Sequence, residues 1–208
     1  MAIIHQATLS PSKLELLIGY VEGLHTLASY VQGDLRQVGA YRFDDPAGQV
    51  GIETHILTSD SGETLQIPVV YRNEALAGAE SSLLGTMEHS VLGERFVYDA
   101  CIDPVYIGEL VRTIVTGGSE VAEIVETPDG QVPRDPSVNV RGSGAEGTAV
   151  PALEALHVER VGTETQVDAG VVSVAIRHVL VPEVEAVASS LSGTWQRGVA
   201  PVTLAVLG

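Results

Sequence analysis

Five titratable side chains on predicted β-strands are the candidates for a binding site. Carboxylate, imidazole and guanidinium groups that meet on one face of a sheet can line a pocket for a small molecule. The candidates are Glu53, His55, Glu88, Arg95 and Asp99. Whether they meet depends on the strands predicted over 50–57 and 83–101.

The segment 50–57 alternates its side chains as a strand with two different faces does. One face would carry Val50, Ile52, Thr54 and Ile56. The other face would carry Glu53 and His55. The tract 59–62, Ser-Asp-Ser-Gly, predicts a turn into a returning strand.

A second hairpin is predicted over 83–101. If its turn centres on Leu92-Gly93, His89 pairs with Phe96 on one face. The other face then brings together the three remaining candidates, Glu88, Arg95 and Asp99.

These side chains could also form a mixed metal site, since metal ions need His, Asp and Glu ligands that converge on one point. The alternative that we favour is a solvated sheet face on which Glu88 and Arg95 form a surface ion pair. We therefore predict no metal site, no cofactor and no catalytic residue. His89 and His178 fall on apolar faces, where a hydrogen-bonded core histidine is the favoured interpretation.

A glycine-rich stretch over 142–147, Gly-Ser-Gly-Ala-Glu-Gly, matches the G-x-G-x-x-G pattern of dinucleotide-binding loops. That chemistry requires the loop to open a helix whose N-terminus holds a pyrophosphate. Here Pro151 follows, within a Gly- and Pro-rich tract. A flexible linker is therefore the favoured interpretation.

The motifs of catalysis are missing from the sequence. A kinase phosphate loop would need a lysine-bearing strand, but the matching run, Val174-Ala175-Ile176-Arg177, ends in arginine, and no His-Arg-Asp or Asp-Phe-Gly follows it. Cys101 lies near Asp99 and Asp103, whose charges would raise the pKa of a thiol, so a structural cysteine is predicted. The sequence leaves enzymatic activity open and favours a non-catalytic role.

The composition limits the classes of partner that the protein is expected to bind. The 208 residues contain 11 Lys plus Arg and 27 Asp plus Glu, a formal charge of −16, which disfavours binding to nucleic acid or to anionic membranes. No secretory signal or membrane-spanning run is recognised, and there is one cysteine, so we expect a cytoplasmic protein. Lys13 is the only lysine, and we expect it on a surface helix.

The remaining pattern predicts an α+β fold that is dominated by antiparallel sheet. Ser10-Pro11 and Asp103-Pro104 are typical helix starts, and they predict two main helices. A short strand is predicted over 2–9. In the C-terminal part, strands are expected over 156–161, 171–181 and 199–207, with a short helix as one interpretation of 182–191.

Several stretches, in order along the first 126 residues, resemble one protein family. The stretches are Met1–His5, Ser10–Leu17, Gly39–Gly48, Val50–His55, Gly85–Gly93, Val97–Asp99, Asp103–Tyr106 and Thr116–Gly118. As a set, they resemble the N-terminal cap domain of actinobacterial maltokinases and, more closely, the stand-alone maltokinase cap-like proteins of actinobacteria.

The resemblance implies a curved, mostly antiparallel sheet with two main helices packed against it. It also implies a cap-like domain over 1–126. The shift to Pro, Gly, Ser and Asp predicts a Gly/Pro-rich linker or long loop over 127–152, and the strand-like runs beyond it predict a β-rich C-terminal segment over 153–208 that packs on the same core. In the kinases, the cap precedes the body that transfers phosphate from ATP. That body has no counterpart here, so no kinase catalytic residue is carried over.

Two functions follow as expectations. The first is a non-catalytic accessory or interaction protein, linked to trehalose, maltose or glycogen metabolism. Its partner would be a carbohydrate-metabolism enzyme, another protein or a second copy of the chain. The second is a protein that binds a sugar or sugar phosphate, or an unrecognised enzyme, which uses the five candidate residues on the concave sheet face.

Overall fold

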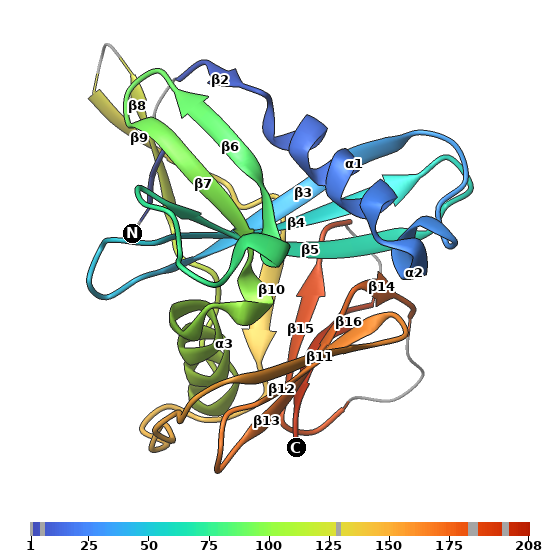
Figure 1. The fold of residues 1–208 in the computed structure, drawn as a ribbon. Coiled ribbons are helices and arrows are strands. Elements are labelled where there is room, and N and C mark those ends of the chain that lie inside the picture. Colours follow the sequence, from blue (N-terminus) through green and yellow to red (C-terminus); the bar gives the residue numbers. More distant parts are fainter. Residues whose placement is uncertain (1, 5–6, 128–129, 183–186, 197–199) are drawn as a thin grey trace.

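The computed structural model describes residues 2–4, 7–127, 130–182, 187–196 and 200–208 (Figure 1). Its largest sheet, here called the N-terminal sheet, is antiparallel and curls into a half-barrel, as the resemblance implied. Its strands are, in spatial order, β2 (Leu9–Ser10), β6 (Leu83–His89), β7 (Gly93–Asp99), β5 (Thr64–Arg72), β4 (Gly51–Ser59) and β3 (Leu35–Asp44).

The second half of the chain forms another antiparallel sheet, the C-terminal sheet. It also contributes two strands to a small third sheet. The C-terminal sheet contains β10 (Asn139–Gly142), β15 (Ser190–Thr194), β16 (Val202–Leu207), β13 (Ser173–Arg177), β12 (Glu164–Asp168) and β11 (His157–Val161). The third sheet contains β1 (Ala2–Ile4), β8 (Glu123–Thr127) and β9 (Gly130–Arg134). A short strand, β14 (Val179–Leu180), pairs with β5 and so joins the C-terminal part to the N-terminal sheet.

Several predicted strands differ from those observed. The strand predicted over 2–9 is two strands in different sheets, and β12 and β15 were not predicted. The helix considered for 182–191 partly lies outside the described residues, and its last two residues belong to β15 instead. The segment 127–152 contains β9 and β10 as well as irregular chain.

The two main helices begin at local capping signals. Helix α1 (Lys13–Gly23) starts two residues later than Ser10-Pro11 predicted, because Ser12 forms a capping box with Glu15. Helix α3 (Pro104–Thr116) starts as predicted: the Asp103 carboxylate accepts a hydrogen bond from the Val105 amide at 2.9 Å. The short helices are α2 (His25–Ala28) and the 3₁₀ turns η1 (Glu80–Ser82) and η2 (Ala100–Ile102).

Both faces of the N-terminal sheet are covered. Helix α1 packs inside the curl, on a core that includes Leu17, Val21, Leu57, Leu65 and Ile67. Helix α3 and the C-terminal sheet cover the opposite face, in a core that includes Ile52, Ile56, Tyr106, Leu110, Val174 and Leu204 (Figure 1). Strand β4 is therefore buried on both faces, which its alternation did not reveal.

Polar side chains also tie the two sheets together. Arg160 on β11 donates to the Asp99 carboxylate at 3.0 Å and to the Tyr20 hydroxyl at 2.7 Å. The amide of Gln66 on β5 donates to two backbone carbonyls of the C-terminal part, those of Arg177 and Leu204. The two sheets thus share both an apolar core and buried hydrogen bonds. None of the helices within the described ranges has the length and apolar character needed to cross a bilayer.

Candidate functional site

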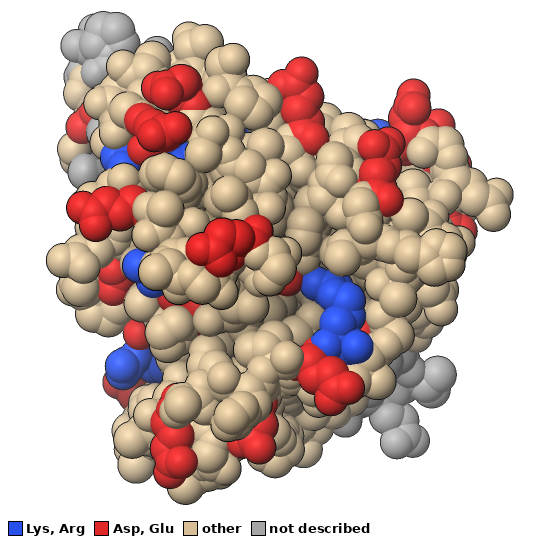
Figure 2. Space-filling model, viewed as in Figure 1, with Lys and Arg blue, Asp and Glu red and all other residues tan. Residues whose placement is uncertain are grey.

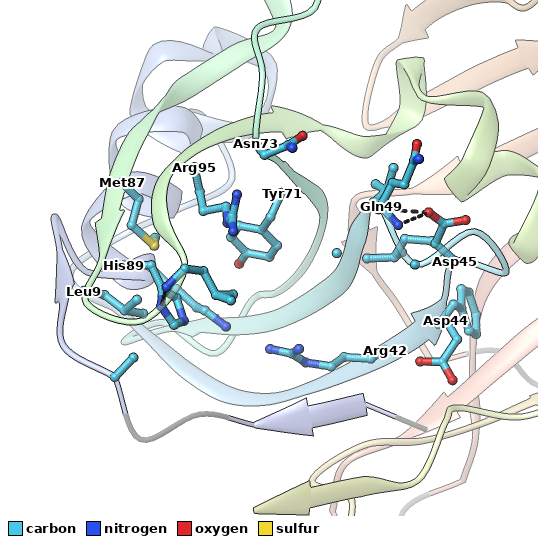
Figure 3. A pocket seen from close by; sticks show the side chains of 18 of the residues that line it. Leu9, Arg42, Asp44, Asp45, Gln49, Tyr71, Asn73, Met87, His89 and Arg95 are labelled. Carbon is cyan, nitrogen blue, oxygen red and sulfur yellow. Dashed lines mark hydrogen bonds between the residues drawn. The ribbon is translucent and has the colours of Figure 1, made fainter. Parts of the chain in front are cut away.

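A cavity of about 800 Å³ opens inside the curl of the N-terminal sheet (Figure 3). Strands β3 to β7 form its walls, and Lys13, the first residue of α1, closes one side. The polar side chains of its lining include Lys13, Arg42, Asp44, Asp45, Gln49, Tyr71, Asn73, Glu74, His89 and Arg95. Its volume is within the range of small-molecule sites, roughly 300–1,000 Å³.

A buried ionic network lies beneath this cavity, centred on Glu53. Its Oε1 lies 3.1 Å from Nη2 of Arg42, and its Oε2 contacts Nζ of Lys13. The Tyr71 hydroxyl donates to the same Oε2 at 3.0 Å. Nε2 of His55 lies 3.1 Å from that hydroxyl and 3.4 Å from Oε2. One carboxylate thus holds two cations and a phenol in fixed positions.

The register of neighbouring strands brings this network together. Arg42 on β3 is directly opposite Glu53 on β4, and residues opposite each other in an antiparallel pair share a face. Tyr71 reaches the same face from β5, opposite Gly51, which has no side chain in the way. The capping box at the start of α1 then places Lys13 over the Tyr71 ring, with Nζ 5.2 Å from the ring centre.

Mutual attraction fixes the charges of this network. Burial alone would raise the pKa of Glu53, but the charges of His55, Lys13 and Arg42 outweigh it and hold that pKa well below its usual range. Burial lowers the pKa of Lys13, and Glu53 opposes this effect. Burial, reinforced by the charge of Glu53, raises the pKa of Tyr71 well above its usual value. Glu53 is therefore ionised and Tyr71 is protonated at neutral pH.

The structure brings only some of the five predicted site residues together. Glu53 and His55 are neighbours, but they are 6% and 0% exposed and lie under the cavity, where a solvated face was the favoured interpretation. Arg95 lines the cavity itself. Asp99 is buried and engaged by Tyr20 and Arg160 instead.

Glu88 lies on the opposite face from Arg95, because the predicted register of the hairpin was wrong. His89 pairs with Gly93, not Phe96, and the turn is Ser90–Leu92. Nδ1 of His89 accepts the amides of Val91 and Leu92 at 3.2 and 3.1 Å, and Gly93 has a φ of 73°. A Gly in the left-handed region is typical of a three-residue hairpin loop. The observed pairing differs from the predicted one by an odd number of residues, so Glu88 and Arg95 lie on opposite faces of the hairpin.

Three residues of the site were not among the predicted candidates: Lys13, Arg42 and Tyr71. Lys13 was expected on the surface, yet it contacts Glu53. Tyr71 lies on the strand that returns after the turn over 59–62. Arg42 had a usable signal, because a hairpin that turns over 44–48 places Arg42 opposite Glu53. No local signal places Lys13, since its contact depends on how α1 docks.

The other motifs have structural roles. Within the described residues, no helix follows the glycine-rich stretch 142–147; it packs instead against the C-terminal end of α3. The Gly144 amide donates to the Ile114 carbonyl at 2.8 Å, and that helix end attracts cations rather than phosphates. Cys101 is fully buried, and burial, with the charge of Asp99 adding to it, raises the pKa of its thiol. His178 is a hydrogen-bonded core histidine, as interpreted from the sequence: its ring nitrogens contact the Thr165 hydroxyl and the Gln66 carbonyl.

In the part of the chain that the structure describes, no group of three or more His, Cys, Asp or Glu side chains is placed to hold a metal ion.

A protein-family model matches part of the chain, whereas no curated protein sequence matches it. Residues 28–103 match the family model of the maltokinase N-terminal cap domain, and this range contains strands β3 to β7, which form the cavity walls. The chain therefore contains a maltokinase cap-like domain.

Proposed function

We propose that this protein is a non-catalytic binding protein, which takes a sugar or sugar phosphate into the cavity of its cap-like domain. The observation that carries the proposal is the cavity of about 800 Å³, whose polar lining is held in place by the buried Glu53 network. A preformed pocket with a few fixed polar groups is the usual form of a small-molecule site.

The lining suits a molecule with many hydroxyl groups. A sugar hydroxyl both donates and accepts hydrogen bonds, so its site needs partners of both kinds. Arg95 and Lys13 donate, the amides of Gln49 and Asn73 do both, and Glu74 accepts. Among the apolar side chains of the lining, the partly exposed Leu9 and the exposed Leu92 offer surface for the ring carbons.

The protonation states beside the cavity support binding without catalysis. A general acid or base works best when its pKa is near the operating pH. Glu53 is held ionised by its neighbours, with a pKa well below its usual range, and the pKa of Tyr71 is raised well above its own. Neither group is tuned to exchange a proton with a ligand near neutral pH.

We further propose that the protein acts in the cytoplasm, as an accessory to a carbohydrate-metabolism enzyme of the trehalose, maltose or glycogen pathways. The match to a maltokinase cap domain supports this link. A surface for a protein partner or a second copy is offered by β11, the outer strand of the C-terminal sheet, where Val158 and Val161 are 38% and 52% exposed. Unpaired strand edges readily pair with another chain.

A thermal-shift and calorimetry panel tests the binding function. The panel contains maltose, trehalose, maltose 1-phosphate, glucosamine, and ATP with magnesium. A ligand present at 100 times its dissociation constant adds about 2.7 kcal/mol to the free energy of unfolding. For a chain of this size, we expect a rise in Tm of roughly 5–10 °C.

Two matched variants locate the binding. Gln49 lines the cavity with an exposed side chain, so Gln49→Trp fills part of the space and is expected to weaken binding at least tenfold. Gln37, also exposed, lies on β3 outside the cavity lining, so Gln37→Trp is the control. The proposal fails if no compound of the panel binds, or if Gln49→Trp leaves its affinity unchanged.

A further inference from the structure

We infer that the ligand of this cavity is a phosphorylated sugar, whose phosphate binds at a cationic end formed by Lys13, Arg42 and Arg95. The inference rests on the proposed function, because it names the ligand class of the same site. It follows from the distribution of charge within the cavity and from which charges are already paired.

The polar groups of the cavity are segregated. Figure 3 shows Arg42, His89 and Arg95 on the same side of the cavity as Tyr71, and Asp44, Asp45 and Gln49 on the opposite side. Lys13 lines the cavity next to Tyr71. A ligand that spans the cavity therefore meets cationic donors at one end, and two carboxylates and an amide at the other.

The cationic end carries more positive than negative charge. Lys13 and Arg42 share the carboxylate of Glu53, which has one oxygen for each. The second contact of Arg42, to Glu123 at 3.6 Å, uses a carboxylate that also lies 3.8 Å from Arg134. Among the described residues, Arg95 has no carboxylate within ion-pair distance. Its guanidinium is thus available to a ligand, and it matches a phosphate in bidentate geometry.

This local charge stands out against an acidic protein. The formal charge of the chain is −16, and acidic side chains are spread over the face seen in Figure 2. That background does not prevent anion binding inside the cavity, because exposed charges are screened over about 8 Å at physiological ionic strength. The cations at this end of the cavity therefore form a local positive region in a protein whose net charge is negative.

The opposite end suits the uncharged part of the ligand. The Asp45 carboxylate is occupied by the turn it belongs to: it accepts the amides of Ala47, Gln49 and Val50 at 2.8–2.9 Å. That contact fixes the wall of the cavity. Gln49 then presents a neutral amide, which pairs with hydroxyl groups rather than with a phosphate.

Calorimetry with matched ligands tests the inference. The probes are maltose 1-phosphate, maltose and inorganic phosphate, each titrated into the wild-type protein at low and at high salt. We expect maltose 1-phosphate to bind at least tenfold more tightly than maltose, and high salt to weaken the binding of the phosphorylated sugar alone. Inorganic phosphate is expected to compete with maltose 1-phosphate.

Three variants assign the effect to Arg95. Arg95→Gln is expected to weaken the binding of maltose 1-phosphate about tenfold or more while it leaves maltose unchanged, because a hydrogen bond to a charged group is lost. Arg95→Lys retains the charge and is expected to recover part of the affinity. Arg36→Gln, an exposed position of β3 outside the cavity, removes the same charge and is expected to have no effect.

The possible results separate the two proposals. If maltose binds as tightly as maltose 1-phosphate, and Arg95→Gln changes neither affinity, the phosphate inference is wrong while the binding function stands. If no compound of the thermal-shift panel binds and inorganic phosphate does not bind either, both proposals are wrong. Phosphate-dependent binding that Arg36→Gln weakens as much as Arg95→Gln would also overturn the inference, since it would reflect overall charge.

Discussion

Arg42 and Glu53 face each other across strands β3 and β4, with Nη2 of the arginine 3.1 Å from Oε1 of the glutamate. Lys13 contacts the other oxygen of the same carboxylate. The Glu53 side chain is only 8% exposed, so solvent offers it little compensation for lost partners. Two cations from different elements therefore depend on a single buried carboxylate.

Glu53→Gln is expected to destabilise the protein strongly. The substitution keeps the size of the side chain but leaves Lys13 and Arg42 without their shared charge. Removing one partner of a buried ion pair costs about 3–5 kcal/mol. Urea unfolding at pH 7 measures the change, and Glu164→Gln is the control, because the Glu164 side chain, which pairs with Arg177, is 36% exposed. The control should cost less than about 1 kcal/mol. Equal losses in the two variants would contradict the role assigned to the network.

The stability of the protein is expected to fall between pH 7.5 and pH 5 because of His178. Burial, assisted by the charge of Arg160, lowers the pKa of His178 from 6.5 to about 4. As the pH falls, His178 of the unfolded chain takes up a proton near pH 6.5, whereas His178 of the folded protein takes one up only near pH 4. The contribution of His178 is thus complete above pH 6.5 and is lost as the pH falls, by about 2 kcal/mol at pH 5.

Urea unfolding at pH 7.5 and pH 5 checks this dependence. His178→Gln should lose less stability between the two pH values than the wild type, since the amide does not titrate. His157→Gln, at an exposed position of β11, should retain the wild-type dependence. If His178→Gln follows the wild type, the pH effect comes from another group.

Gly144→Ala and Gly19→Ala should change stability in opposite directions. A Cβ atom at Gly144 would lie 2.0 Å from the Val115 carbonyl oxygen, so the tract would have to move away from the end of α3. We expect a loss of about 2 kcal/mol or more. A Cβ atom at Gly19, in the exposed interior of α1, meets nothing within 4 Å, and alanine should stabilise the helix by about 0.5–1 kcal/mol. Thermal unfolding distinguishes the two, and a neutral Gly144→Ala would contradict the close packing.

Local patterns predicted the parts of the fold that depend on nearby residues. Asp103-Pro104 marked the start of α3, and the glycine at 117, with a φ of 65°, ends it. The strand over 50–57 was recognised from its alternation. The missed strand β12 lies within a turn-rich part of the sequence, and its pairing with β11 and β13 comes from the sheet as a whole.

The candidate site was harder to predict, because it combines elements that are distant in sequence. The hairpin register was decided by the His89 ring, which caps the turn, and no alternation pattern reveals such a contact. Lys13 meets Glu53 only when α1 packs inside the curl. Glu53 and His55 were identified by type and face, but their burial depends on that same packing.

The shared core around α3 also bears on whether the cap-like part of the chain could fold without the rest. Residues 28–103 contribute the apolar side chains Ile52, Ile56 and Val70 to a core whose other half comes from α3 and the C-terminal sheet. If the chain were cut after residue 126, α3 would remain, but the part of that face under the C-terminal sheet would be exposed to water and would promote aggregation. In this protein, the C-terminal sheet covers that part of the face.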